Sequence, residues 1–281
     1  MPTGRPSTTM LNAATLRAAH QLLDKPLIFH DPIAVGLVPK SSEQAVLATL
    51  DEHRDQVALR LHIALRSRFA EDRLEAAAAR NVRQYVIVGA GLDTFPWRQP
   101  DHARNMTIFA VDDIATLAST QVLFWEHGLP KPANLTFVSA DLEDLRLGES
   151  LVDFGFDPST PSFCSVLGVT QYISRQAVDA LLEFASSLNA GSEIVFSFVP
   201  TDDDLRREDV QMAADAAKRH IALGEPWKTR LDLHQLVKYL TRLGFSNVFH
   251  LTPELAKQRY LAGRENAVSP YGAELIVAAV V

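Results

Sequence analysis

The stretch QYVIVGAGLDTFPWR, residues 84–98, passes from a short run of Val and Ile into a turn with glycine at positions 89 and 91. A short apolar run rich in β-branched residues predicts a buried strand. Gly89 and Gly91 would let the backbone approach a ligand, although a purely structural turn carries the same pattern. Thr94 stands where a dinucleotide-binding turn has its third glycine. The stretch therefore predicts the strand and turn that open a nucleotide-binding α/β sheet.

A short apolar run followed by a helical stretch recurs along the middle of the chain. Further runs are MTIFAVDD, LTFVSADL, SFCSVLGV and EIVFSFVP, and helical stretches such as RQAVDALLEFASSLNAG lie between them. This alternation predicts a doubly wound, Rossmann-like α/β sheet. Near the end, GFSNVFHLTP and ELIVAAVV are two apolar runs close in sequence, so we expect an antiparallel last strand that closes the sheet as a hairpin.

Helical patterns flank the predicted sheet. Residues 51–80 have apolar positions at intervals of three and four, which predicts one amphipathic helix or a pair of them. We find no internal repeat or Gly/Ser linker, so we expect a single domain over residues 1–281. Its expected parts are an N-terminal helical cap (1–80), a cofactor-binding core (81–200), a helical lid insertion (201–243) and closing strands (244–281). Both helical parts should lie over the strand ends.

The composition limits the partners of the chain. A net charge of −7 and a pI of about 5.7 disfavour nucleic acid and anionic lipid, since either would require a basic face. The single cysteine, Cys164, excludes an internal disulfide and a cysteine-based zinc cluster, and we expect no metal. No run approaches the roughly 18 apolar residues of a membrane span, and no signal peptide is evident. We expect a cytoplasmic protein whose partner is a small molecule or another protein; its oligomeric state is left open.

Acidic residues follow three successive predicted strands. Because ligands of an open α/β sheet bind beyond the carboxyl ends of its strands, these acids are candidate ligand contacts. Asp112 directly follows the second run, about twenty residues after the glycines, where an acid accepts hydrogen bonds from ribose hydroxyls; Asp113 is the alternative. Asp141 and Leu142 follow the third run and offer an acceptor for an adenine amino group beside an apolar contact for the ring.

Asp93 distinguishes between possible nucleotide ligands. A dinucleotide would place its pyrophosphate over the glycine turn, where this carboxylate repels it. The ammonium and sulfonium groups of S-adenosylmethionine tolerate or favour a carboxylate there. The alternative is that Asp93 only caps the following helix.

Ordered motifs along nearly the whole chain resemble one family. The chain is similar to the leucine carboxyl methyltransferase-like group of S-adenosylmethionine-dependent O-methyltransferases, in particular its actinobacterial and polyketide-tailoring branch. The resemblance implies a class I methyltransferase fold, S-adenosyl-L-methionine as cofactor and a role in secondary metabolism. The motifs are LIFHDPIA, RSRFAEDRL, VGAGLDTFPWR, FAVDD, SADLEDL, LGVTQYI, GEPW and RYLAGR.

The resemblance also implies roles for single residues. Arg66 would pair with the methionine carboxylate, which suits a bidentate guanidinium, although a solvated helix face is the alternative. Gly89, Gly91 and Asp93 would approach the methionine and the sugar. Asp112 would bind the ribose, and Asp141 together with Leu142 would bind the adenine. One departure is Leu167, where many relatives have an acid near the reacting methyl group.

The acceptor is expected to be a carboxyl or a phenolic hydroxyl of a small metabolite, such as a polyketide. A carboxylate is ionised at neutral pH, whereas a phenol, with a pKa near 10, benefits from a base. His30 and Tyr172 are the weak candidates for that base, and a structural role is the alternative for each. Residues expected to bind the acceptor are Tyr172, Trp227, Tyr260 and Arg264, with Arg259 as an alternative cation; packing and surface ion pairs are the alternatives.

Three other functions compete with methyl transfer. A nicotinamide-dependent oxidoreductase uses the same fold, but Asp93 and Thr94 count against it. A protein that binds S-adenosylmethionine without catalysis stays open because of Leu167. A serine hydrolase is excluded because the chain has no Gly-x-Ser-x-Gly elbow.

Overall fold

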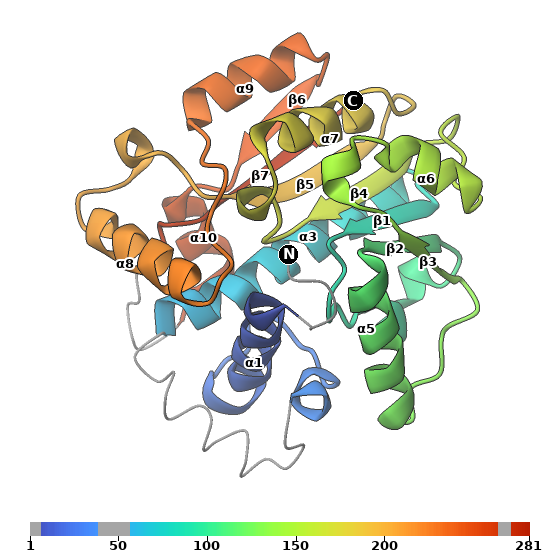
Figure 1. Cartoon of the computed structure of the whole chain (residues 1–281), viewed down its shortest axis with the longest axis horizontal. Coiled ribbons are helices and arrows are strands. Elements are labelled where there is room, and N and C mark those ends of the chain that lie inside the picture. Colours follow the sequence, from blue (N-terminus) through green and yellow to red (C-terminus); the bar gives the residue numbers. More distant parts are fainter. Residues whose placement is uncertain (1–6, 39–56, 264–270) are drawn as a thin grey trace.

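The computed structural model describes residues 7–38, 57–263 and 271–281 and contains one seven-stranded sheet of order β3-β2-β1-β4-β5-β7-β6 (Figure 1). Val88, at the end of β1, pairs with Val111 of β2 and Val166 of β4, so these parallel strands end level with one another. The strands are β1 (Gln84–Val88), β2 (Thr107–Asp112), β3 (Leu135–Ser139), β4 (Ser162–Val166), β5 (Glu193–Phe198), β6 (Asn247–His250) and β7 (Leu275–Val280). The predicted doubly wound α/β sheet is confirmed.

The closing strands differ in one respect from the predicted hairpin. β7 is antiparallel to both of its neighbours, β5 and β6, as expected for an antiparallel last strand. However, α10 (Pro253–Tyr260) lies between β6 and β7 in the chain, so no tight turn joins them. β7 is also inside the sheet, because its sequence LIVAAV is apolar throughout and is buried except at its ends, whereas β6 forms the edge.

Helices cover both faces of the sheet. They are α1 (Thr8–Leu23), α3 (Val57–Ala79), α4 (Phe95–Arg98), α5 (Ile114–Glu126), α6 (Leu147–Asp153), α7 (Arg175–Ser186), α8 (Asp209–Ala222) and α9 (Leu233–Arg242). The short 3₁₀ turns are η1 (Ala34–Leu37), η3 (Asp101–Ala103), η4 (Leu142–Asp144), η5 (Thr170–Tyr172) and η6 (Asp202–Asp204).

The alternation of side chains along the strands divides the core in two. Tyr85 and Ile87 of β1 face one cluster, which contains α3 and α10, whereas Val86 and Val88 face the other, which contains α6, α7 and α9. The strand residues that point to a helix layer are buried in the central strands, and the polar ends of the strands are left for the site. Within the described residues, no helix is long and apolar enough to cross a membrane.

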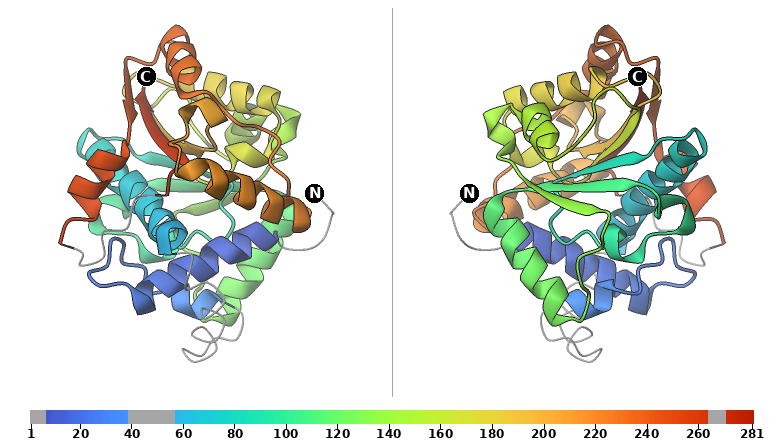
Figure 2. Two further views of the ribbon diagram at one scale, coloured as in Figure 1. Left: turned by 90° about the vertical axis from the view of Figure 1, so that its left-hand side faces the viewer. Right: turned by 90° about the vertical axis from the view of Figure 1, so that its right-hand side faces the viewer.

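The two helical segments outside the core divide their roles differently from the prediction. α1 and α8 contribute residues to the cavity beyond the strand ends and lie near one another on that side of the sheet (Figure 2). α3 packs along a face of the sheet and also contributes Arg66 to the cavity, whereas α9 packs on the opposite face through Leu236 and Leu240. The cavity is therefore covered by α1 and α8, while α3 and α9 belong to the helix layers.

A fully buried carboxylate, Asp31, anchors the glycine turn to the N-terminal segment. Its Oδ2 accepts a hydrogen bond from Thr94 Oγ1 at 2.6 Å and lies 2.9 Å from Arg17 Nε. Its Oδ1 accepts hydrogen bonds from the backbone N–H groups of Ile33 and Ala34. Arg17 also donates to the carbonyl of Leu92 in the turn. The HDPIA motif therefore fixes where the turn lies.

We predict that Asp31→Ala lowers the free energy of unfolding by about 3 to 5 kcal/mol, because it leaves the largely buried Arg17 without its carboxylate. Chemical denaturation measures this loss. Asp101→Ala, which removes a carboxylate paired with Arg104 on the open surface, is the matched control and should leave the denaturation midpoint unchanged. Equal effects of the two substitutions would contradict the anchoring role of Asp31.

Candidate functional site

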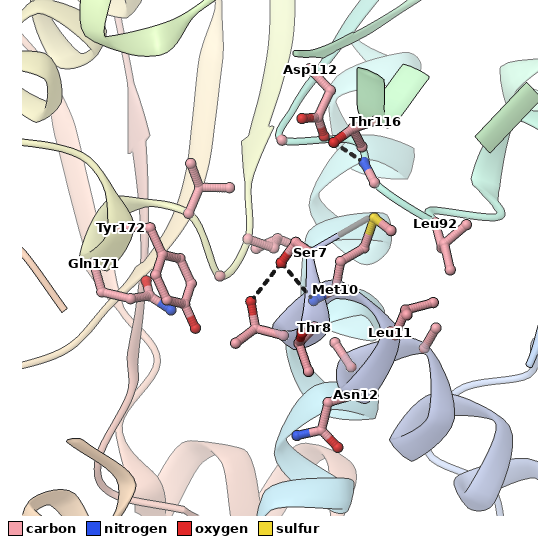
Figure 3. A pocket seen from close by; sticks show the side chains of 18 of the residues that line it. Ser7, Thr8, Met10, Leu11, Asn12, Leu92, Asp112, Thr116, Gln171 and Tyr172 are labelled. Atoms are coloured by element: carbon pink, nitrogen blue, oxygen red, sulfur yellow. Dashed lines mark hydrogen bonds between the residues drawn. The ribbon is translucent and has the colours of Figure 1, made fainter. Parts of the chain in front are cut away.

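A cavity of about 1220 Å³ lies beyond the carboxyl ends of β1 to β4. Figure 3 shows Asp112 and Tyr172 on opposite sides, with the first turn of α1 between them. The lining includes most of the residues predicted from the sequence, from the cofactor set Arg66, Gly89, Gly91, Asp93, Asp112, Asp141 and Leu142 and from the acceptor set Tyr172 and Trp227. Residues far apart in sequence are thus brought to one place by the common edge of the strands.

The glycine turn requires glycine at both positions. Gly89 has φ +69°, and a Cβ there would lie 2.3 Å from Val169 Cγ2. Gly91 has φ +45°, and a Cβ there would lie 3.0 Å from Met10 Cγ. Both values of φ are in the left-handed region that other residues seldom adopt. The turn is therefore built so that bare backbone faces the cavity.

Asp112, rather than Asp113, is the acid available to a ligand. Asp112 accepts hydrogen bonds from the backbone N–H of Gly91 at 2.8 Å and from that of Asp113 at 2.8 Å. Burial raises its pKa to about 6, and the two backbone hydrogen bonds only partly offset that effect. Asp113 instead caps α5 by accepting from Ala115 N and Thr116 N. Asp113 thus has a capping role within the chain, and the binding of ribose by Asp112 stays a prediction.

The other two strand-end acids combine a structural contact with a place in the cavity. Asp93 accepts a hydrogen bond from Phe95 N at 2.8 Å, which is the capping role considered as its alternative, and it also lines the cavity. Asp141 accepts from Glu143 N at 2.9 Å and begins η4. Leu142, beside it, packs against the core and borders the cavity. One oxygen of each carboxylate is thus occupied locally.

Arg66 is held by a carboxylate of the chain itself. Its Nη1 donates to Glu274 Oε1 and Oε2 at 2.9 and 3.1 Å, and Glu274 Oε2 also lies 3.1 Å from His62 Nε2. The pKa of the buried Glu274 carboxyl lies well below its usual range: burial acts to raise it, but Arg66 and His62 together outweigh burial. A Cβ on Gly168 would lie 2.8 Å from Arg66 Nη1, so Gly168 leaves room for the guanidinium. The solvated helix face considered for Arg66 is therefore excluded.

Aromatic rings form the side of the cavity opposite Asp112. Tyr172, which follows β4, donates or accepts a hydrogen bond with His220 Nδ1 of α8 at 3.2 Å. The His220 ring also lies beside the Trp227 ring, with centroids 5.3 Å apart. Tyr271 and Arg219 border the same region. Tyr172 and Trp227 were predicted from the sequence, whereas His220, Arg219, Tyr271 and Glu274 were not.

Three of the predicted residues lie outside the cavity. His30 is exposed and does not border it, because the chain turns its side chain to the surface just before the buried Asp31. Tyr260 donates a hydrogen bond to Asp72 at 2.9 Å in a separate surface pocket, together with Arg259, which lies over the Phe249 ring. These predictions are corrected: α10 packs on the far side of α3 from the cavity. Arg264 lies outside the described residues.

Glu225 joins the two segments that cover the cavity. Its carboxylate accepts hydrogen bonds from the Ser7 hydroxyl, from the N–H groups of Thr8 and Thr9, and from the Thr9 hydroxyl. An acid at the N-terminus of α1 complements the helix dipole. The GEPW motif thus fastens α1 to the loop after α8. Nothing in the sequence indicated this contact, because Glu225 lies one residue after a helix-ending glycine and more than two hundred residues from α1.

Comparison with known proteins identifies the family. The model of the leucine carboxyl methyltransferase family matches residues 10–186, more than half of the chain. The chain belongs to this family. The resemblance found in the sequence motifs is therefore confirmed, and the matched region of this family member contains α1, Arg66, the glycine turn and all three strand-end acids.

The relatives agree with this family. A proposed S-adenosyl-L-methionine-dependent methyltransferase of Bacillus subtilis (strain 168), YktD, is 28% identical over 288 residues, covering 94% of this chain and 94% of that protein. Another from Mycobacterium avium (strain 104) is 32% identical over 230 residues, covering 75% of this chain and 73% of its own. A proposed methyltransferase structure from Thermobifida fusca has a TM-score of 0.61 at 16% identity, covering 99% of this chain and 96% of its own. The structural likeness concerns the fold alone.

We predict that Asp112→Asn raises the free energy of unfolding at pH 7 by about 2 kcal/mol. The pKa of Asp112 is about 6 in the folded chain, compared with 3.8 ordinarily, so ionisation at neutral pH opposes folding by up to about 3 kcal/mol, and the neutral amide removes this cost. The amide has one oxygen for the two backbone N–H donors of Gly91 and Asp113, so the variant loses about 1 kcal/mol of hydrogen bonding at every pH. The wild type loses stability through this group as pH rises from about 4 to 6, so the variant should be more stable than the wild type at pH 7 and slightly less stable near pH 4. Denaturation at both pH values measures this. Asp113→Ala removes a helix cap and should lower the free energy of unfolding by about 1 kcal/mol. A similar loss for Asp112→Asn at pH 7 would contradict the raised pKa of Asp112.

We predict that Glu274→Gln lowers the free energy of unfolding at pH 7 by about 3 to 5 kcal/mol, because Arg66 keeps a buried charge without its carboxylate. The depressed pKa of Glu274 means that its stabilisation is present above the ordinary glutamate pKa of 4.5 and is lost as pH falls below it. The difference from wild type should therefore narrow at pH 3.5. Glu75→Gln, at an exposed position of α3, is the control and should show no difference at either pH. A difference in the free energy of unfolding between the variant and the wild type that does not change with pH would contradict the ion pair.

Proposed function

We propose that this chain transfers the methyl group of S-adenosyl-L-methionine to an oxygen atom, a carboxyl or a phenolic hydroxyl, of a small metabolite such as a polyketide. One observation carries the proposal. Along the strand ends, in the order β4, β1, β2 and β3, the cavity is lined by a cation, bare glycine backbone, a half-buried acid and an apolar contact. This order matches the parts of the cofactor: Arg66, beside Gly168, for its carboxylate, Gly89 and Gly91 for the sugar and methionine, Asp112 for the ribose, and Leu142 for the adenine.

The side chains retain the bonding capacity that this cofactor would need. Each Asp112 oxygen accepts one backbone hydrogen bond and has a second lone pair for a ribose hydroxyl. The hydrogen bonds of Arg66 to Glu274 involve Nη1, so within the described residues Nη2 and Nε remain for a ligand carboxylate. Both groups are held rigidly by the fold, which favours preorganised recognition. The residues therefore fit the cofactor.

The work of the chain is to orient the reactants and to exclude water. Bound S-adenosylmethionine supplies an electrophilic methyl group on a cationic sulfur. Arg66 and Asp112 would fix the two ends of the cofactor, and Tyr172 and Trp227 would hold the acceptor on the opposite side. Such positioning can supply on the order of 7 to 11 kcal/mol of the barrier reduction. α1, fastened by Glu225, would keep water from the reacting atoms.

The size and lining of the cavity favour a small acceptor. A volume of about 1220 Å³ exceeds the roughly 300 to 1000 Å³ typical of a pocket for one drug-sized ligand, which leaves room for a cofactor and a small molecule together. Aromatic walls suit a flat, partly apolar compound. A nicotinamide-dependent oxidoreductase fits less well, because Asp93 faces the turn where a pyrophosphate would lie.

The proposal predicts two effects of Asp112→Asn with opposite signs. The variant should be more stable yet bind S-adenosylmethionine about 10 to 100 times more weakly, the worth of a charge-assisted hydrogen bond of about 1.5 to 3 kcal/mol. Calorimetric titration with the cofactor measures the affinity, and Glu75→Gln should bind like wild type. If the more stable variant binds S-adenosylmethionine with unchanged affinity, Asp112 does not contact the ribose.

Transfer itself is tested with methyl-labelled S-adenosylmethionine and small-molecule fractions of a cell extract. Label that mild alkali releases as methanol identifies a methyl ester, and alkali-stable label identifies an ether. Cofactor binding without transfer to any fraction would favour the non-catalytic alternative that Leu167 left open.

A further inference from the structure

His220 is the histidine that borders the cavity, in place of the exposed His30. It lies on α8, on the side of the cavity opposite Asp112, with its Nδ1 atom 3.2 Å from the Tyr172 hydroxyl. The rings of Tyr172 and Trp227 flank the imidazole at centroid distances of 5.7 and 5.3 Å. The imidazole is thus fixed from two sides, as the orientation of a catalytic base requires.

The surroundings of His220 keep its imidazole neutral. Burial lowers its pKa, and the neighbouring Arg219 guanidinium on the same helix lowers it further. Glu225 in the following loop and Glu274 before β7 act in the opposite direction but do not reverse the shift. The hydroxyl of Tyr172, from η5, completes the set of polar groups that face the ring. A neutral imidazole has one nitrogen with a free lone pair and can accept a proton.

Tyr172 borders the cavity beside His220, and its hydroxyl is the group bonded to the imidazole. Figure 3 shows its ring at the cavity wall, opposite Asp112. Burial is the main reason that the pKa of Tyr172 is raised to about 12, so the phenol stays protonated at neutral pH. A protonated hydroxyl can donate its hydrogen to His220 Nδ1 while its oxygen accepts a hydrogen bond from a ligand. The pair thus has the geometry of a proton relay that leads out of the cavity.

The neighbouring Gln171 supports a ligand with hydrogen-bond donors. Its side chain is buried and borders the cavity, and Oε1 has no hydrogen-bond partner among the described residues. Buried acceptors are normally satisfied, so a ligand that completes this region should bring a donor. A hydroxylated compound brings one, whereas a simple carboxylate brings none. The observation separates the two acceptor classes that the proposed function leaves open.

We propose that Tyr172 and His220 form a proton relay that deprotonates a hydroxyl group of the acceptor, so that the enzyme makes methyl ethers of phenols. This inference rests on the proposed function. In the step, the acceptor oxygen forms a bond to the methyl carbon and the carbon–sulfur bond breaks, its electron pair remaining on sulfur as the thioether. The acceptor proton passes to Tyr172 Oη as the Tyr172 proton passes to His220 Nδ1. His220 ends protonated and returns its proton to solvent.

The hydrogen-bond direction is tested first by nitrogen NMR of histidine-labelled protein with S-adenosylhomocysteine bound. His220→Asn assigns the His220 signals, and His30→Asn removes a different set. We expect an unprotonated Nδ1 on His220 at pH 8 and a shifted Nδ1 resonance in Tyr172→Phe. A protonated Nδ1 would overturn the relay, because Nδ1 would then be a donor to Tyr172. This measurement requires no acceptor and decides the case even if no probe is methylated.

Turnover is then measured with two probes, unsubstituted phenol and 4-nitrophenol, which is already ionised at pH 8. General base catalysis is worth about 10² to 10⁴-fold, so His220→Asn and Tyr172→Phe should reduce kcat for phenol at least 100-fold. For 4-nitrophenol the loss should be much smaller, because no proton has to leave. The matched controls His30→Asn and Tyr260→Phe lie outside the cavity and should retain wild-type kcat with both probes.

The outcomes separate this inference from the proposed function. Equal losses with the two phenols would show that the pair only shapes the pocket and would overturn the relay. Methylation of benzoate but of neither phenol would overturn the relay and leave the proposed O-methyltransferase function standing. Failure to bind S-adenosylhomocysteine and to methylate any probe would overturn the proposed function, and the relay with it.

Discussion

The buried ion pair of Arg66 and Glu274 is the contact on which the arrangement of the cavity depends. It joins α3 to the residues before β7, and it lies against Gly168 at the end of β4. Two charges buried together are expensive to desolvate, and they persist only because the geometry is good and further hydrogen bonds support it. His62 supplies part of that support. The ion pair fixes the position of the Arg66 guanidinium between the two halves of the cavity.

The same cavity contains a group that opposes folding. Asp112 is half-buried at the end of β2, and its raised pKa shows that the loss of solvent around the carboxylate outweighs the hydrogen bonds from Gly91 and Asp113. Sites that bind ligands commonly retain such destabilising groups, since their interactions are completed only by the ligand. Asp31, by contrast, is fully satisfied by the chain. The difference between these two acids distinguishes a structural carboxylate from one that is available to a ligand.

The fold, and the gathering of the candidate cofactor residues at one edge of the sheet, could be predicted because local sequence patterns specify both. The runs around Val86, Val111 and Cys164 are continuous and apolar, as buried parallel strands must be, and the residue after each run lies at the common edge. The rest of the site could not be predicted, because it is assembled from contacts between distant segments. His220 and Glu225 belong to a polar, surface-like stretch, and only the packing of α8 over the strand ends brings them to Tyr172 and to the start of α1. The prediction for His30 was wrong for the opposite reason. His30 lies next to a motif whose acid is buried, and this burial turns the His30 side chain outward.

A crystal structure with bound S-adenosylhomocysteine tests the central claim most directly. The account predicts that the ribose hydroxyls contact Asp112, that the amino acid carboxylate contacts Arg66, and that the sulfur faces the side of the cavity formed by Tyr172 and His220. A cofactor bound with its sulfur toward another wall, or bound outside this cavity, would contradict it.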